Sequence, residues 1–270
     1  MIDKKKIKRA IRRMVRLTGY DVSQVENAQD AFLHSHLAAL FDKLGIECVI
    51  DVGANEGQFG DFLRDVVGFN GLIVSFEPIA RHFEVLEART RTDKSWIAFQ
   101  LALGRESGTQ KINVMESGDF SSFLTPNHAQ VGEFTRDNVV KYTELTQVKT
   151  LDSMLGELLP RVALEHTYLK LDTQGYDLDV IGGAREAIKR LPMLQTEVSI
   201  RPIYEGMPSF RESYDTLTSM GFDITGLFPV TRDRQGRVVE FDCVMLNTAL
   251  LERSRAPAMA NARSPGNAYC

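Results

Sequence analysis

Cysteine is scarce in this chain, and its spacing excludes two common uses of the residue. The three cysteines among 270 residues are Cys48, Cys243 and Cys270. They form no CxxC pair and no Cys/His spacing typical of zinc, and three scattered thiols make no disulfide framework. Cys48 and Cys243 lie in apolar, strand-like runs, where a free buried thiol is expected. This usage fits a reducing compartment and predicts a cytoplasmic protein.

Long hydrophobic runs are also missing. No apolar stretch approaches the ~20 residues needed to span a bilayer, and the basic start of the chain is not followed by the apolar segment of a secretory signal. The formal net charge of −4 is small and gives no indication of a nucleic-acid partner. No set of side chains completes a metal-ligand pattern, and we predict no metal site.

Positive charge is concentrated at the beginning of the chain. Residues 1–17 contain eight Lys or Arg against the single acid Asp3. Within residues 2–17, Ile7 and Ile11 recur at helical spacing, which predicts an amphipathic basic helix. Two interpretations remain open: peripheral contact with an anionic inner membrane surface, or a solvated helix that covers part of the core. The second is favoured because the apolar stripe is short.

Strands and helices alternate through most of the remaining sequence. Apolar runs predict strands at residues 47–51, 71–76, 96–103, 111–115, 168–172 and 193–200. Helical periodicity predicts helices at residues 28–44, 57–67, 80–89, 151–159, 177–190 and 209–220. Residues 222–230 and 237–247 flank the turn sequence RDRQG and predict a hairpin. The alternation indicates an α/β fold with a doubly wound, mostly parallel seven-stranded sheet that ends in an antiparallel C-terminal hairpin strand.

Three regions follow from this pattern. Residues 1–45 hold the basic helix and a second helix, residues 46–250 form the main domain, and residues 251–270 lack apolar periodicity, which predicts a disordered tail. Residues 116–147 are predicted to be irregular.

A glycine-rich loop follows the first strand, in the sequence VIDVGANEGQFG. In a doubly wound sheet, ligands bind at this position, outside the carboxyl ends of the strands. A dinucleotide fingerprint beginning at Gly53 would need a second glycine at position 55, which is Asn. The loop therefore suits a smaller group bearing an amine and a carboxylate, with helical N–H donors available near Gly57.

A carboxylate ends the next strand, in the sequence SFEP. Glu77 lies 26 residues after Asp51, where it can accept hydrogen bonds from both hydroxyls of a ribose, and Pro78 turns the chain away. A glycine loop and a ribose-binding acid without a diphosphate site fit S-adenosyl-L-methionine.

Several further stretches resemble the FkbM family of S-adenosylmethionine-dependent methyltransferases. They are VIDVGANEGQFG, FEPIARHFEVL, ALG, SSF, VKTLDSML, LKLDTQGYDLDVIGGARE and LQTEVS, in that order over about residues 47–200. The resemblance implies a class I methyltransferase fold and methyl transfer to a hydroxyl of a sugar, glycoconjugate or secondary metabolite. The chain departs from the family at Asp177, where a longer glutamate is typical.

The resemblance also implies which residues hold the cofactor. The loop residues are Asp51, Gly53, Ala54, Asn55 and Gly57, with Glu77 on the ribose and Pro78 beside it. Ala102 and Leu103 would border the adenine. Ser121 either contacts the cofactor or bonds within a local turn.

Methyl transfer to oxygen needs a base near the acceptor, at a carboxyl end of the sheet. Asp172 ends the fourth strand and is the first choice, and Glu197 lies toward the end of the fifth. Their structural alternatives are a loop cap for Asp172 and an ion pair with Arg201 or Lys170 for Glu197. His166 lies at the wrong end of the sheet.

Two other functions keep part of this pattern. A nicotinamide-dependent oxidoreductase would share the fold but needs the glycine that Asn55 replaces. A noncatalytic cofactor-binding protein could dock on a membrane through residues 2–17. The acceptor is expected to be a small molecule or a glycan whose pocket is shaped by residues 116–147 and the loop after Ile200, where Tyr204 could stack on a sugar ring.

Overall fold

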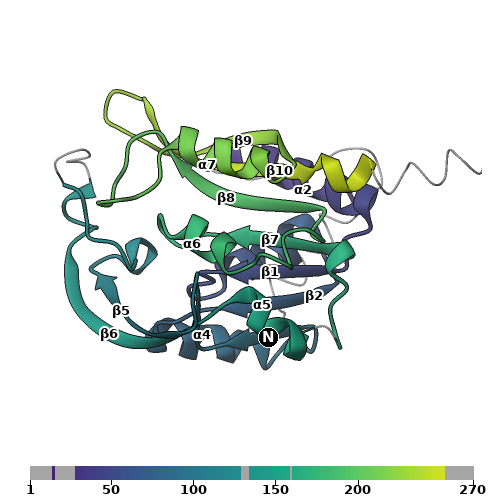
Figure 1. Cartoon of the computed structure of the whole chain (residues 1–270), viewed down its shortest axis with the longest axis horizontal. Coiled ribbons are helices and arrows are strands. Elements are labelled where there is room, and N and C mark those ends of the chain that lie inside the picture. Colours follow the sequence, from purple (N-terminus) through teal and green to yellow (C-terminus); the bar gives the residue numbers. More distant parts are fainter. Residues whose placement is uncertain (1–13, 16–27, 129–133, 159, 253–270) are drawn as a thin grey trace, which may run out of the picture.

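We describe a computed structural model of the chain over residues 14–15, 28–128, 134–158 and 160–252. Seven strands form the central sheet in the order β3-β2-β1-β7-β8-β10-β9 (Figure 1). Their bounds are β1 (Cys48–Val52), β2 (Leu72–Phe76), β3 (Trp96–Phe99), β7 (Thr167–Leu171), β8 (Met193–Ser199), β9 (Phe222–Arg232) and β10 (Val238–Asn247).

The pairing directions confirm the sequence prediction of a mostly parallel sheet. β1 pairs parallel with β2 and β7, and β8 continues the parallel set beside β7. β10 runs antiparallel to both β8 and β9, so it is the reversed strand of the C-terminal hairpin. The chain leaves β1 toward β2 and β3 and later returns to its other side as β7. The topological switch point, where such sheets bind ligands, therefore lies between the carboxyl ends of β1 and β7.

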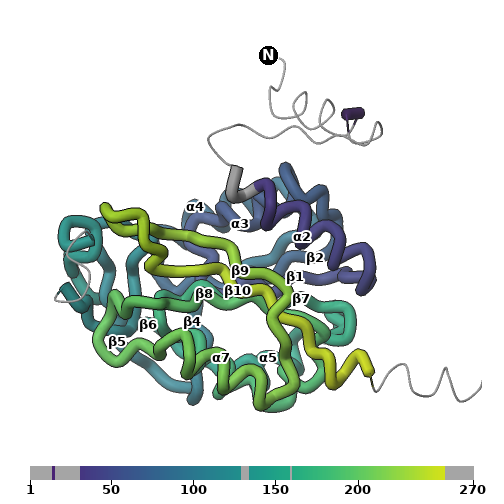
Figure 2. Tube along the Cα trace, turned by 90° about the horizontal axis from the view of Figure 1, so that it is seen from above, coloured from purple at the N-terminus to yellow at the C-terminus, as the bar shows by residue number. Residues whose placement is uncertain are grey.

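Helices cover both faces of the sheet (Figure 2). On one face lie α2 (Ala28–Leu44), α3 (Gln58–Phe62) and α4 (Ala80–Thr90), and on the other lie α5 (Leu151–Leu158), α6 (Asp177–Gly182) and α7 (Phe210–Ser219). β1 is buried along its whole length because both of its faces are covered. Leu37 packs in the first layer and Leu217 in the second, both fully buried. Cys48 and Cys243 are buried free thiols, as expected.

A second, three-stranded sheet departs from the prediction. β4 (Ala102–Leu103), β5 (Gly108–Met115) and β6 (Val140–Lys149) pair in the order β4-β6-β5. The prediction that residues 116–147 are wholly irregular is therefore wrong. β6 has most of its side chains exposed, so its sequence VKYTELTQVK lacks the apolar alternation that predicts a strand. Likewise, the single strand predicted at 96–103 is divided between the two sheets.

One predicted helix changes type along its length, and another is shorter than expected. The helix predicted at 57–67 is α3 followed by a π-helical turn, Leu63–Val67. The helix predicted at 177–190 ends as α6 at Gly182. At Gly183 a Cβ atom would come within 2.0 Å of the Gly104 carbonyl oxygen, so the backbone here is fixed by a close approach between two loops.

The predictions for residues 2–17 and for the tail fall almost entirely outside the described residues. Membrane contact through the basic N-terminus, tail disorder and the cytoplasmic location therefore stay predictions. Among the described residues, no helix combines the length and the apolar character needed to cross a bilayer.

Candidate active site

A cavity of about 590 Å³ opens at the carboxyl ends of the parallel strands. Its volume lies within the range of small-molecule sites. One end is formed by the glycine loop after β1 and by the end of β2, and the other by residues of β7, β8 and β10. Ten of the predicted site residues line it: Gly53, Ala54, Asn55, Glu77, Pro78, Ala102, Leu103, Ser121, Asp172 and Glu197.

The glycine loop is held tightly against its neighbouring strands. The N–H groups of Gly53 and Ala54 both donate to the Phe76 carbonyl at 3.0 Å. Gly53 has φ +79, and a Cβ atom built there would lie 1.9 Å from the carbonyl oxygen of Asp172. Glycine is therefore required at this position mainly because the loop after β7 lies so close to it. This contact joins the two ends of the cavity.

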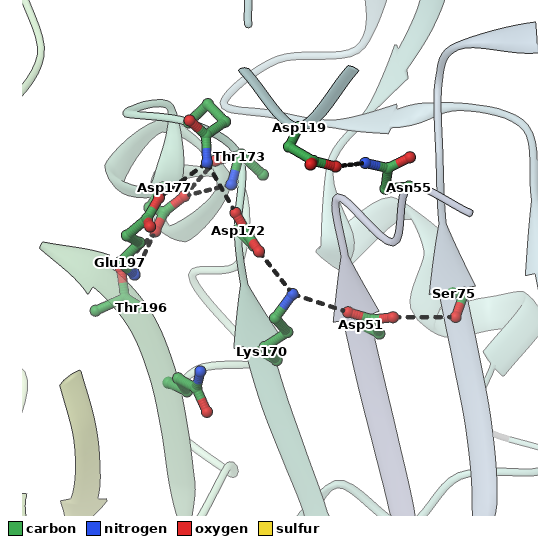
Figure 3. Close-up of polar contacts among 12 residues, drawn as sticks. Asp51, Asn55, Ser75, Asp119, Lys170, Asp172, Thr173, Asp177, Thr196 and Glu197 are labelled. Atoms are coloured by element: carbon green, nitrogen blue, oxygen red, sulfur yellow. Dashed lines mark hydrogen bonds and ion pairs between the residues drawn. The ribbon is translucent and has the colours of Figure 1, made fainter. Parts of the chain in front are cut away.

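Glu77 links the end of β2 to this loop. Its side chain is 3% exposed, and its two carboxylate oxygens accept hydrogen bonds from the N–H groups of Asn55 and Ile79, each at 2.8 Å. Asn55 adopts φ +49, and its amide donates to Asp119 (Figure 3). Each Glu77 oxygen retains a second lone pair, so the carboxylate can still accept hydroxyl groups from a ligand.

Burial raises the pKa of Glu77 to about 7, against the opposing effect of its two backbone N–H donors. Between pH 4.5 and pH 7 the folded chain then holds a proton at Glu77 that the unfolded chain has released, so this group's contribution to stability falls as pH rises. From pH 5 to pH 8, the free energy of unfolding of the parent should therefore fall by about 3 kcal/mol more than that of Glu77→Gln, which has no carboxylate to ionise. Unfolding with denaturant at four pH values measures this difference, and parallel pH curves for the two proteins would contradict it.

Two predicted cofactor residues do not reach the cavity lining. Asp51 is fully buried on β1, beneath the loop, where Ser75 and Lys170 contact it. Gly57 has φ +90 and packs against Trp96, which a Cβ atom would meet at 3.1 Å. The presence of an aspartate at position 51 and a glycine at position 57 is thus explained by contacts within the fold, which the sequence pattern of strand and loop does not reveal.

Lys170 forms a buried ionic connection between β1 and β7 (Figure 3). Its Nζ lies 3.5 Å from Asp51 Oδ1 and 3.0 Å from Asp172 Oδ2, and 4.8 Å above the Phe59 ring. Burial lowers the pKa of Lys170, but the charges of Asp172 and Asp51 outweigh it and hold that pKa above its ordinary value. Lys170 therefore remains a cation that orients Asp172, and the alternative pairing of Lys170 with Glu197 is not what the structure shows.

Asp177, not Asp172, fixes the loop after β7. Its Oδ1 accepts hydrogen bonds from the N–H and the hydroxyl of Thr173, and its Oδ2 accepts from the Thr196 hydroxyl and the Glu197 N–H (Figure 3). The shorter carboxylate at this position thus joins the loop to β8. Asp172 is left free of a capping role and faces the cavity.

Glu197 lies among other acids at the far end of the cavity. Burial, followed by the negative charges of Glu240, Asp172 and Asp242, raises the pKa of Glu197 well above its ordinary value. Its carboxylate accepts a hydrogen bond from the amide of Gln174 at 2.9 Å. A carboxylate in these surroundings binds a proton more readily than an exposed glutamate does.

The wall between the two ends is mostly apolar. Ala102 and Leu103 lie on β4 and are buried, with Phe76 opposite on β2. Ser121 lines the cavity while its hydroxyl accepts the Met115 N–H at 3.2 Å, so it takes part in a local turn as well. Tyr204 is fully buried and donates to the Phe120 carbonyl, so it is not exposed for stacking on a sugar.

Sequence reasoning missed several residues at the acid-rich end. They are Gln174, Gln195, Thr231, Glu240 and Asp242, together with the lining role of Lys170. Glu240 and Asp242 lie on β10, which pairs beside β8 although it is more than 40 positions away in sequence. A charged residue inside an otherwise apolar strand, as in VVEFDCVML, was the signal that could have identified them.

The sequence of this chain matches a known protein family. The family described as "Methyltransferase FkbM domain" matches residues 51–224, more than half of the chain. A local match of 35% identity over 80 residues exists to 2-O-methyltransferase NoeI of Sinorhizobium fredii. It covers 30% of this chain and only 29% of that protein.

Two solved structures show a distant likeness to this chain. Methyltransferase FkbM from Methylobacillus flagellatus shares 18% identity at a TM-score of 0.47, over 74% of this chain and 43% of that one. Fibrillarin from Aeropyrum pernix, in complex with natively bound S-adenosyl-L-methionine, shares 13% identity at a TM-score of 0.42, over 80% and 76%. Both scores are below 0.5, so the assignment rests on the family match. With its mostly parallel sheet, reversed β10 and loop after β1, the chain belongs to the FkbM family of methyltransferases, enzymes whose methyl donor is S-adenosyl-L-methionine.

Proposed function

We propose that this chain transfers a methyl group from S-adenosyl-L-methionine to a hydroxyl oxygen of a small polyhydroxylated acceptor, such as a sugar, glycoconjugate or secondary metabolite. One observation carries the proposal: a single cavity joins the Gly53–Glu77 end to an end where Asp172 and Glu197 converge. The name of the local relative, 2-O-methyltransferase, agrees with oxygen as the acceptor atom.

The residues present fit this methyl donor. The buried Glu77 carboxylate has lone pairs for two ribose hydroxyls, and the apolar surfaces of Phe76 and Leu103 suit a flat base. Gly53 and Ala54 leave the loop surface open beside them. Bound there, the sulfonium of the donor would supply an activated electrophilic methyl group, so the protein need not provide a covalent nucleophile.

The acceptor end supplies the acid–base chemistry. Glu197, a half-buried carboxylate with a raised affinity for protons, accepts the proton that the acceptor hydroxyl loses. Asp172, held by the cationic Lys170, accepts a hydrogen bond from the acceptor and fixes its orientation. This division of roles reverses the first choice made from the sequence, because burial and neighbouring acids raise the pKa of Glu197 and hence its affinity for protons.

Binding and turnover experiments test the proposal. Calorimetry should show binding of S-adenosylhomocysteine and no comparable binding of NAD, which separates a methyltransferase from the nicotinamide oxidoreductase. A panel of neutral sugars and hydroxylated metabolites, incubated with the enzyme and methyl donor, should yield a product heavier by one methylene in mass spectrometry. Binding of the nucleoside without a methylated product across a broad panel would instead support the noncatalytic alternative.

Glu77→Gln should weaken binding of S-adenosylhomocysteine by about 1–3 kcal/mol, since a charge-assisted hydrogen bond to the ribose is lost and the Asn55 N–H is held less well. Isothermal titration calorimetry measures the change. The matched control is Glu84→Gln, an exposed carboxylate on α4 that should bind like the parent. Equal affinities for Glu77→Gln and the parent would remove Glu77 from the ribose site.

A further inference from the structure

Gln174 occupies a position between the two carboxylates of the acceptor end. It follows β7 in the loop Thr173–Gly175, and its amide nitrogen Nε2 lies 3.1 Å from Asp172 Oδ1 and 2.9 Å from Glu197 Oε2. A primary amide carries two N–H donors, so this single group can donate to both carboxylates at once.

The other side of the amide is held by the protein. Gln174 Oε1 lies 3.0 Å from the Tyr204 hydroxyl, whose single proton is shared with the Phe120 carbonyl at 2.6 Å, and Tyr204 is fully buried. The Gln174 backbone carbonyl accepts from the Ser122 hydroxyl at 2.8 Å. The amide presents its NH₂ group to the carboxylate oxygens of Asp172 and Glu197, which accept hydrogen bonds, and its oxygen to the Tyr204 hydroxyl.

The backbone at this residue is in a conformation that glutamine rarely adopts. Gln174 has φ +53 and the next residue, Gly175, has φ +88. A Cβ atom at Gly175 would come within 2.9 Å of Met207 and 3.1 Å of Leu124, so the turn is packed beneath two other segments. Glycine or asparagine would meet the left-handed conformation at lower cost, and strained residues of this kind concentrate at functional sites.

We propose that Gln174 is a positioning residue for methyl transfer, whose amide, oriented by Tyr204, holds the carboxylates of Asp172 and Glu197 in one arrangement at the acceptor end of the cavity. This inference rests on the proposed function and adds a residue that acts through the two acids.

The electrostatic surroundings explain why a neutral donor is needed there. The charged and titratable groups around Glu197 are Asp172 and Lys170 on β7 and the loop that follows it, Asp177 on α6, Glu240 and Asp242 on β10, and Tyr204. Acids predominate among them, so bringing two carboxylates together requires N–H groups that favour their ionised forms. A carboxylate at position 174 would add repulsion instead, whereas the amide relieves it.

The test is a titration of Glu197 in the full chain, followed by NMR of ¹³C-labelled glutamate side chains and assigned with Glu197→Gln. In Gln174→Met, which keeps the length of the side chain but lacks the amide, we expect the apparent pKa of Glu197 to rise by about one pH unit. Tyr204→Phe should shift it in the same direction by less. Gln147→Met, an exposed glutamine on β6, is the matched control and should leave it unchanged.

Gln174→Gly separates positioning from a purely structural role. Glycine accepts the left-handed backbone, so this variant should fold with an undiminished melting temperature and still show the upward shift of Glu197. Once an acceptor is known, the same variant should show a lower kcat and an unchanged KM. An unchanged Glu197 titration in Gln174→Met and Gln174→Gly would overturn the proposal, and so would a parent Glu197 that stays protonated up to pH 9.

Binding of S-adenosylhomocysteine is measured on the same samples and should be equal in parent and variants. If the parent does not bind it, the methyl-transfer proposal fails, while the Glu197 titration still reports whether Gln174 holds the carboxylates. The two proposals therefore fail separately.

Discussion

Gly53→Ala should lower the free energy of unfolding by about 3 kcal/mol. The added Cβ atom would lie 1.9 Å from the Asp172 carbonyl oxygen, which belongs to backbone and cannot rotate away. The residue would also have to keep φ +79, which alanine adopts only at a further cost. Because the loop and the end of β7 must separate, binding of S-adenosylhomocysteine should weaken in the same variant.

Two other glycines serve as matched controls for this substitution. Gly156 lies exposed on α5 with nothing within 4 Å of an added methyl group, so Gly156→Ala should be neutral or slightly stabilising. Gly236 has φ +81 but open space, so Gly236→Ala isolates the backbone contribution at about 1 kcal/mol. Unfolding with denaturant gives the free energy of unfolding of each of the three variants. If Gly53→Ala were no less stable than Gly236→Ala, the close approach to Asp172 would not constrain the fold.

Glu197→Gln should reduce the rate of methyl transfer by about 10²–10⁴-fold, the usual loss when a general base is removed. The substitution keeps the size of the side chain but removes its proton affinity, while the Gly53–Glu77 end of the cavity is untouched. Affinity for S-adenosylhomocysteine should therefore be unchanged. In the parent the rate should rise with pH as Glu197 ionises, because burial and neighbouring acids raise its pKa, and this limb should disappear in the variant.

Single-turnover measurements with an acceptor from the panel, across pH 5–9, check this expectation. Glu157→Gln, an exposed carboxylate on α5 that does not line the cavity, is the matched control and should retain the parent rate and pH profile. A loss below tenfold that keeps the ascending limb would assign the base elsewhere, and Asp172→Asn would then be expected to show the larger loss.

The sequence alone determined the central sheet and the residues at the glycine-loop end of the cavity. Both depend on local signals, because a strand buried on both faces reads as a continuous apolar run, and the loop after it reads as glycines at fixed spacing. Gly53 and Glu77 could be found this way, since a parallel sheet brings the carboxyl ends of its strands to one edge whatever the rest of the chain does. The family resemblance then placed Ala102 and Leu103 near that edge, and the end of the fourth predicted strand placed Asp172 there.

Only the tertiary structure decided the surroundings of the acids at the other end of the cavity. Lys170 sits within a strand, and nothing in YLKLD shows that it lies between Asp51 and Asp172. Glu240 and Asp242 reach Glu197 because β10 pairs beside β8, a contact between distant segments that leaves no periodic signal. The proton affinity of a carboxylate depends on how deeply it is buried and which charges surround it. Those quantities exist only once the chain has folded, which is why the sequence could name Asp172 and Glu197 but not tell which of them lies among other acids.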